Sequence, residues 1–329
     1  MYRSPINYLW CLFLNPKDFL QKISDETKDI VSSDFDIEIN TTEYVPNVDD
    51  TNITYENLDS KCKKCKTIET CVLYIDIRKS TELNLKHRPK TLAKLYTVFV
   101  RNMIKCAEYH GGYVRNIIGD RIMVVFDRNN CFKNAIDTAV LLNTVAEYII
   151  NKNFKNNDIV CGIGIDFGSM LVVKTGTIKQ GNENQFYKSL VWLGKPANIA
   201  SKLTDNANKS TVSSKNKVRV GLHYPLTNKW NWTEISYSEF LNHLEITYSP
   251  TLNYKNEYFK YFYEVTESNP VSIPPILITD EVYQGFKKDC PDDQSLKEEM
   301  WKKVKLTIPG YDGGIYGGNI RFTIVDEIN

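Results

Sequence analysis

Between residues 71 and 173, the order in which strand-like and helix-like hydrophobic patterns follow one another limits the fold more than any other feature. Residues 71–77, CVLYIDI, form a short apolar run of strand length. Apolar residues at helical spacing follow in 87–110 and again in 132–149. The segment between them, 113–126, predicts a hairpin, and 159–173 predicts a further strand pair. The order βαββαβ indicates an α+β, ferredoxin-like fold, in which an antiparallel sheet carries both helices on one face.

The hairpin segment reads YVRNIIGDRIMVVF and has a Gly-Asp pair between two apolar runs. A two-residue turn with Gly first is a common hairpin connection. The pattern therefore predicts that Asp120 lies at the tip of a turn. By period 2, Tyr74 and Asp76 share one face of the strand 71–77, and Ile77 points to the other face.

The rest of the chain is expected to surround this core. Residues 1–70 are mostly polar and acidic, which favours an N-terminal arm that packs on a main domain of residues 71–329. The apolar run at 6–14 is about half the length needed to span a bilayer, so we expect a docked helix. Residues from about 208 to 275 are rich in Asn, Tyr and Trp and predict a packed, β-rich insertion.

The composition excludes several classes of function. A net charge of +1 gives no general electrostatic reason to bind nucleic acid or an anionic membrane. Residues 15–19, NPKDF, follow the apolar run and do not resemble a signal-peptide cleavage site, so we expect a cytoplasmic chain. Cys62 and Cys65 form a CxxC without a second metal-ligand pair, which disfavours a zinc or redox site.

Two carboxylates are the strongest candidates for chemistry. Asp76 ends the first strand, and in a ferredoxin-like sheet we expect this central strand to lie next to the hairpin strand reached through the first helix. Asp76 and the turn residue Asp120 can then converge. Two neighbouring carboxylates suit a shared proton or shared cations, and a pair of Mg²⁺ or Mn²⁺ ions is the usual machinery for moving a phosphoryl group.

Three motifs in this order resemble those of class III nucleotide cyclases. YIDIRKST resembles their first metal motif, NIIGDRIMVVF their hairpin with the second metal aspartate, and LGKPANIASKL their dimer-facing segment. The resemblance covers about residues 71–205. With the stretches VPNVDDTNITY and TIETCVLYIDIRKST, it is closest to the pyrimidine cyclases of bacterial antiphage (Pycsar) systems.

The resemblance implies a set of site residues. Asp76, Asp120 and the Ile77 carbonyl would bind two Mg²⁺ or Mn²⁺ ions. Asn198 would orient the ribose. Lys202 stands where the family usually has an arginine that stabilises the transition state, which replaces a bidentate fork by a point charge. The residues that would cradle the outer phosphates through backbone amides and hydroxyls are Lys79, Ser80 and Thr81.

The base pocket departs from the purine cyclases, which have a lysine and an aspartate or threonine at two positions that here hold Asn116 and Val191. Valine cannot accept a hydrogen bond from the amino group of adenine. Asn116 has a donor and an acceptor and suits uracil or cytosine, and Tyr74 either fills the space of a purine ring or is an ordinary core aromatic. The amide does not choose between UTP and CTP, and the resemblance favours UTP.

In this family, each site is built from two chains, so the resemblance implies a head-to-tail homodimer. The reaction would convert a nucleoside triphosphate to a 3′,5′-cyclic nucleotide and pyrophosphate. The cyclic nucleotide would be a second messenger for a separate effector. Two alternatives stay open. One is an adenylate or guanylate cyclase with an atypical pocket, and the other is a cyclase-like module that binds a nucleotide without turnover.

Overall fold

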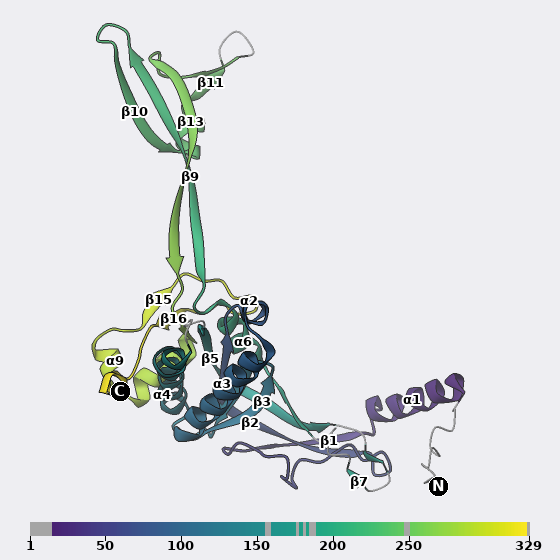
Figure 1. The fold of residues 1–329 in the computed structure, drawn as a ribbon. Coiled ribbons are helices and arrows are strands. Elements are labelled where there is room, and N and C mark those ends of the chain that lie inside the picture. The colour runs from purple at the N-terminus through teal and green to yellow at the C-terminus, as the bar shows by residue number, and fades with distance from the viewer. Residues whose placement is uncertain are drawn as a thin grey trace, which may run out of the picture. The chain divides into compact units, whose positions relative to one another are not determined.

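The computed structural model describes residues 15–154, 159–175, 178–179, 182–183, 189–246 and 251–327 (Figure 1). The apolar run 6–14, for which we expected a docked helix, lies outside these residues. The chain divides into two compact units, one of Met1–Asn208 with Pro274–Asn329 and the other of Lys209–Ile273.

The larger unit contains a mixed sheet of nine strands. Its strands are β1 (Asp36–Thr41), β2 (Cys62–Ile77), β3 (Gly112–Ile118), β4 (Arg121–Phe126), β5 (Cys161–Thr175), β8 (Ser189–Leu193), β14 (Ile276–Thr279), β15 (Lys302–Val304) and β16 (Ile315–Gly318). The strand order is β15-β16-β14-β5-β2-β4-β3, with β1 also paired to β2 and β8 to β5. The order β5-β2-β4-β3 is that of the ferredoxin-like fold, which confirms the predicted class.

The helices predicted in 87–110 and 132–149 are present, and the unit contains further helices. Its helices are α1 (Pro16–Val31), α2 (Ser80–Lys86), α3 (Pro89–Tyr109), α4 (Cys131–Thr144), α5 (Asn151–Asn153), α6 (Lys195–Asn206), α8 (Asp280–Asp289) and α9 (Gln294–Lys297). A π-helical turn, Val145–Ile150, extends α4, and a 3₁₀ helix occupies Thr323–Glu327. The short strands β6 (Ile178–Lys179) and β7 (Asn182–Glu183) pair with each other in a separate sheet. No helix in the described ranges is both long and apolar enough to cross a membrane.

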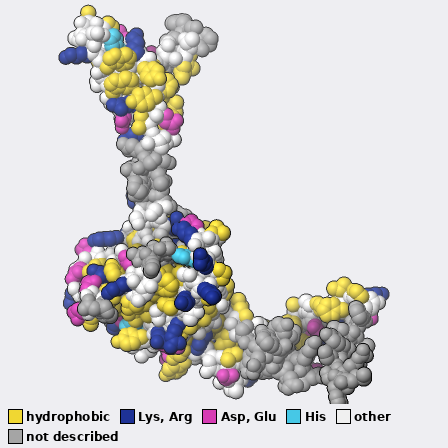
Figure 2. Space-filling model, in the orientation of Figure 1, with side chains coloured by type: hydrophobic (Ala, Val, Ile, Leu, Met, Phe, Trp, Pro, Cys, Tyr) yellow, Lys and Arg dark blue, Asp and Glu magenta, His cyan; other side chains and the backbone are white. Residues whose placement is uncertain are grey.

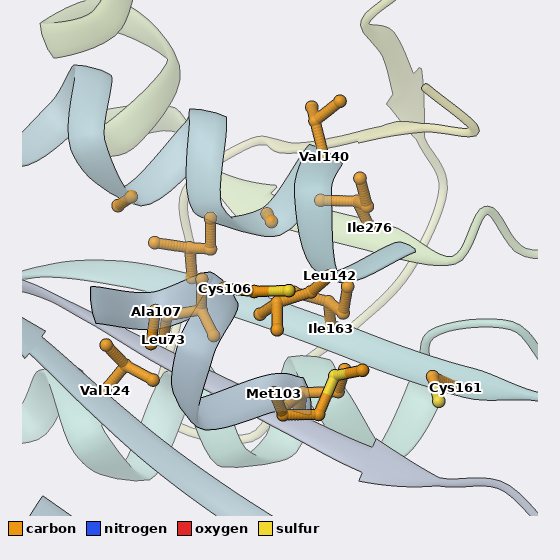
Figure 3. Close-up of a cluster of buried hydrophobic side chains, with 14 of the residues drawn as sticks. Leu73, Met103, Cys106, Ala107, Val124, Val140, Leu142, Cys161, Ile163 and Ile276 are labelled. Carbon is orange, nitrogen blue, oxygen red and sulfur yellow. The ribbon is translucent and has the colours of Figure 1, made fainter. Parts of the chain in front are cut away.

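The main core lies between the sheet and the helices α3 and α4. Leu73 and Ile163 from β2 and β5 pack there with Met103, Cys106 and Leu142 from the two helices (Figure 3). This arrangement confirms that α3 and α4 cover one face. The helix α6 covers the other face, where Val72, Met123 and Ala200 belong to a second cluster.

Two details of the sheet correct the sequence-based expectations. The segment 159–173 is not a strand pair, because β5 runs unbroken from Cys161 to Thr175 and pairs with β2 from Lys66 to Ile77. The neighbour of β2 on its other side is β4, the second hairpin strand, and not β3, which lies at the edge. The strand β2 also begins at Cys62, so the CxxC lies within a strand, where residues three apart point to opposite faces.

The smaller unit is β-rich, as expected for the insertion. It contains β9 (Ser210–Tyr224), β10 (Lys229–Ser236), α7 (Tyr237–Asn242), β11 (Leu244–Ile246), β12 (Leu252–Tyr254) and β13 (Phe259–Ser272). Val218 and Val220 of β9 pack against Phe240 of α7 on one face of the sheet β10-β9-β13. Figure 2 shows hydrophobic side chains gathered on the surface of this unit. The exposed aromatic residues of the unit include Trp230, Trp232, Tyr261, Phe262 and Tyr263. The expected packing of the aromatic residues therefore holds for one set of them only.

The approach of α6 to the sheet requires glycine in β5. A Cβ atom at Gly164 would lie 2.3 Å from the Ala200 carbonyl oxygen and 2.5 Å from the Thr204 amide nitrogen. These are backbone atoms of α6, which cannot move without moving the helix. The glycine thus fixes the distance between α6 and the strand.

We expect Gly164→Ala to lower the free energy of unfolding by about 1–3 kcal/mol, because the added methyl group displaces α6. Urea denaturation followed by circular dichroism measures this change. Gly314→Ala is the matched control, since its nearest atoms lie at 3.6 Å or more. Equal stability of the two variants would contradict the close approach of α6.

A second prediction concerns Asp166, which is 3% exposed and accepts a hydrogen bond of 2.7 Å from Thr279 Oγ1. Burial raises the pKa of its carboxyl from 3.8 to about 6. Because the folded state holds this proton more tightly than the unfolded state, the contribution of the group to stability is fully present below the unfolded pKa of 3.8. It is lost as the pH rises through the folded pKa of about 6. Asp166→Asn should therefore be more stable than the wild type at pH 8 by on the order of 2 kcal/mol, with no difference near pH 4. Urea denaturation at both pH values tests this, and a constant difference would contradict it.

Candidate active site

The structure brings Asp76 and Asp120 together. Asp76 is the penultimate residue of β2, and the hairpin turn of Gly119 and Asp120 joins β3 to the neighbouring β4. Ile118 pairs with Arg121, which confirms the two-residue turn, and Gly119 adopts the left-handed φ of +63° that such a turn needs. Burial and the Asp76 carboxylate raise the pKa of Asp120, against the opposing effect of its backbone and Ser80 hydrogen bonds.

The chemistry of this pair fits a divalent cation. Among the residues that the structure describes, the Oδ2 atom of Asp120 is buried and has no hydrogen-bond partner. A buried acceptor without a donor, next to a second carboxylate, is costly unless a cation binds there. Within the described ranges, no group of three or more His, Cys, Asp or Glu residues could hold a metal ion, so further ligands would come from backbone oxygens such as that of Ile77 or from a substrate.

Four further residues surround Asp76, and the sequence analysis did not single them out. Arg121 donates to Asp76 Oδ2 through Nη2 at 2.6 Å and to Ser201 Oγ through Nη1 at 2.8 Å, and it also pairs with Asp205. Arg78 donates to Asp76 Oδ2 at 3.2 Å and to the Asp205 carbonyl at 2.9 Å. The available signals were the arginine directly after Asp120 and the i, i+4 spacing of Ser201 and Asp205 on the predicted helix.

The predicted phosphate loop lies beside the carboxylates. Lys79 has a left-handed φ of +55° and precedes α2, so the chain turns sharply directly after β2. Ser80 hydrogen-bonds to Asp120. Lys79 is exposed and its Nζ lies 3.6 Å from Glu82 Oε1, and Thr81 is also exposed. The loop therefore adjoins the carboxylate pair through Ser80.

Asn198 and Lys202 lie one turn apart on α6 and belong to the same chain as the carboxylates. Asn198 is exposed, and Lys202 donates from Nζ to the Pro309 carbonyl oxygen at 2.7 Å. No hydrogen bond or ion pair joins either side chain to Asp76 or Asp120 in the described part of the chain. The neighbouring pair on the same helix, Ser201 and Asp205, is the one that reaches the carboxylate network through Arg121.

The residues predicted to contact the base divide between the two faces of the sheet. Tyr74 pairs with Met123 and Met123 with Asn116, so these side chains share the face covered by α6. Asn116 is exposed, and burial raises the pKa of the Tyr74 hydroxyl. Val191 lies on β8 next to Trp192, which packs in the same cluster as Tyr74. By the alternation of strand residues, Val191 points to the opposite face.

Comparison with known families identifies the class of this fold. Residues 62–238 match the model of the adenylate and guanylate cyclase catalytic domain. The match covers both carboxylates, the loop of residues 79–81 and α6. The chain belongs to this family and is a nucleotide cyclase, a class of enzyme that acts on nucleoside triphosphates and generally uses divalent metal ions.

Individual relatives carry more specific names. The chain is 29% identical to a uridylate cyclase of Burkholderia cepacia over 179 residues, which cover 53% of this chain and 72% of the relative. It is 28% identical to a uridylate cyclase of Xanthomonas perforans, over 54% of this chain and 77% of the relative. A cytidylate cyclase of Escherichia coli is 28% identical over 44% of this chain and 33% of the relative. Among solved structures, the adenylyl cyclase CyaB of P. aeruginosa has a TM-score of 0.46 and 15% identity, over 77% of this chain and 94% of that chain.

The carboxylate pair predicts how Mn²⁺ affects stability. We expect Mn²⁺ to raise the unfolding temperature of the wild type by a few degrees at about a hundred times its dissociation constant, and Asp120→Asn to abolish this shift. Differential scanning fluorimetry measures it. Asp59→Asn removes an exposed carboxylate elsewhere and should keep the full shift. The same shift in Asp120→Asn would show that the cation binds elsewhere.

Proposed function

We propose that this protein is a pyrimidine nucleotide cyclase that converts UTP, or CTP, to the 3′,5′-cyclic nucleotide and pyrophosphate. The observation that carries the proposal is the pair Asp76 and Asp120, in which the buried Oδ2 of Asp120 has no partner among the described residues. The relatives named as uridylate and cytidylate cyclases support the pyrimidine base.

In this proposal, Asp76, Asp120 and the Ile77 carbonyl hold two Mg²⁺ or Mn²⁺ ions. Such ions supply charge neutralisation at the triphosphate and make the ribose 3′-oxygen a better nucleophile for attack on the α-phosphorus. The loop of Lys79, Ser80 and Thr81 offers backbone amides and hydroxyls to the outer phosphates. Its position beside the carboxylate pair, through Ser80, supports this role.

The remaining roles act on the sugar, the leaving phosphates and the base. Asn198 orients the ribose, and Lys202 places a positive charge near the transition state. Asn116 reads the base with its amide, and Tyr74, on the same face, limits the space for a purine. Val191 offers no polar readout of adenine, although it points to the other face of the sheet in this chain.

We further propose a head-to-tail homodimer. In one chain, Asn198 is exposed, and neither Asn198 nor Lys202 forms a hydrogen bond or ion pair with Asp76 or Asp120 within the described residues. An exchange of these residues between two chains would complete two equivalent sites. The seven cysteines in the described ranges are all free thiols, which supports a reducing compartment such as the cytoplasm. The resemblance to antiphage cyclases leads us to propose that the product signals to a separate effector in defence against phage.

The test is to incubate the purified full chain with Mn²⁺ and each of the four ribonucleoside triphosphates, and to identify the products by mass spectrometry. We expect cyclic UMP or cyclic CMP, and a loss of at least about a hundredfold in turnover in Asp76→Ala. Asp59→Asn should retain full turnover. Cyclic AMP or cyclic GMP alone would overturn the assignment of the base pocket, and no product from any substrate would favour a module that binds without turnover.

A further inference from the structure

The guanidinium group of Arg121 joins three parts of the candidate site. It donates to Asp76 Oδ2 through Nη2 at 2.6 Å and through Nε at 3.3 Å. It also donates through Nη1 to Ser201 at 2.8 Å and pairs with Asp205 Oδ1. Because β4 begins at Arg121, this side chain extends from the hairpin turn to both β2 and α6.

Both arginines near Asp76 bind the same carboxylate oxygen. Arg78 donates to Asp76 Oδ2 at 3.2 Å, as Arg121 does, and its Nη1 donates to the Asp205 carbonyl oxygen of α6. This leaves Oδ1 of Asp76 outside both guanidinium contacts. The side chains of Asp76 and Arg121 are 15% and 25% exposed, so water competes little for these contacts. The arginines therefore orient the carboxylate.

We propose that Arg121 is a positioning residue that turns Asp76 Oδ2 toward α6, leaves Oδ1 for a divalent cation shared with Asp120, and couples this cation to α6. The expected effect of Arg121 on catalysis rests on the proposed function, in which Asn198 and Lys202 of α6 take part. In the proposed dimer, these residues serve the other site, so Arg121 connects the two sites through one helix.

The charges of the network fix the direction of the expected effects. Arg121 places a positive charge beside the carboxylate that receives the cation, and Asp205 partly neutralises that charge. Removing the charge of Arg121 should tighten cation binding, whereas removing that of Asp205 should weaken it. Because the Asp205 carboxylate pairs with Arg121, we expect its effect on the cation to act mainly through that guanidinium group, so this effect should become small without Arg121.

The experiment measures binding of Mn²⁺ alone to the full chain, by isothermal titration calorimetry, in Arg121→Gln, Asp205→Asn and the double variant. We expect affinity to rise about threefold to tenfold in Arg121→Gln and to fall by a similar factor in Asp205→Asn. The double variant should resemble Arg121→Gln, which makes the two changes non-additive. Arg321→Gln, which breaks the exposed pair with Asp326 elsewhere, is the matched control and should leave affinity unchanged.

A second measurement separates positioning from a merely structural role. In Arg121→Gln, kcat should fall about a hundredfold although Mn²⁺ binds more tightly, because Asp76 is no longer held in one orientation. Arg121→Lys keeps the positive charge but lacks the planar guanidinium group with its several donors. This variant should therefore bind Mn²⁺ like the wild type and still have a lower kcat. Unfolding temperatures of all variants confirm that they are folded.

The outcomes distinguish this proposal from the proposed function. Unchanged Mn²⁺ affinity in both folded single variants, or additive effects in the double variant, overturns the coupling even if the wild type makes a cyclic nucleotide. If the wild type makes no product but the non-additive pattern appears, the coupling stands and the proposed function is wrong.

Discussion

The antiparallel pairing of β2 with β4 on one side and β5 on the other is the constraint on which the candidate site depends. It brings the end of β2, with Asp76, beside the turn that carries Asp120. It also places Gly164 opposite Tyr74, where the missing side chain leaves room for α6. One register of pairing therefore sets the position of the carboxylates and of the helix behind them.

Partly buried charge is the second property that shapes this site. The side chain of Asp76 is 15% exposed, so its unpaired charge would be costly to bury. The guanidinium groups of Arg78 and Arg121 compensate that charge. Asp120 has no such partner for its Oδ2 atom within the described ranges, so part of its desolvation cost is not offset there. The proposed cation would offset this remaining cost at Asp120.

The family match includes part of the smaller unit. The family match runs from residue 62 to residue 238 and ends within this unit, just after β10. The unit has its own small core of Val218, Val220 and Phe240. The pairing of β9 with β13 continues to Ser210 and Ser272, which lie next to the first and last residues of the unit.

The sequence by itself determined the order of elements, the hairpin turn at Gly119 and Asp120, and the two faces of β2. These features follow from local periodicity and turn chemistry, which do not depend on distant residues. Only the tertiary structure decided that β5 is one unbroken strand, that β4 and not β3 lies beside β2, and that Arg121, Arg78 and Asp205 gather around Asp76. Strand neighbours and ion pairs between residues far apart in the chain depend on packing, and no local pattern encodes them.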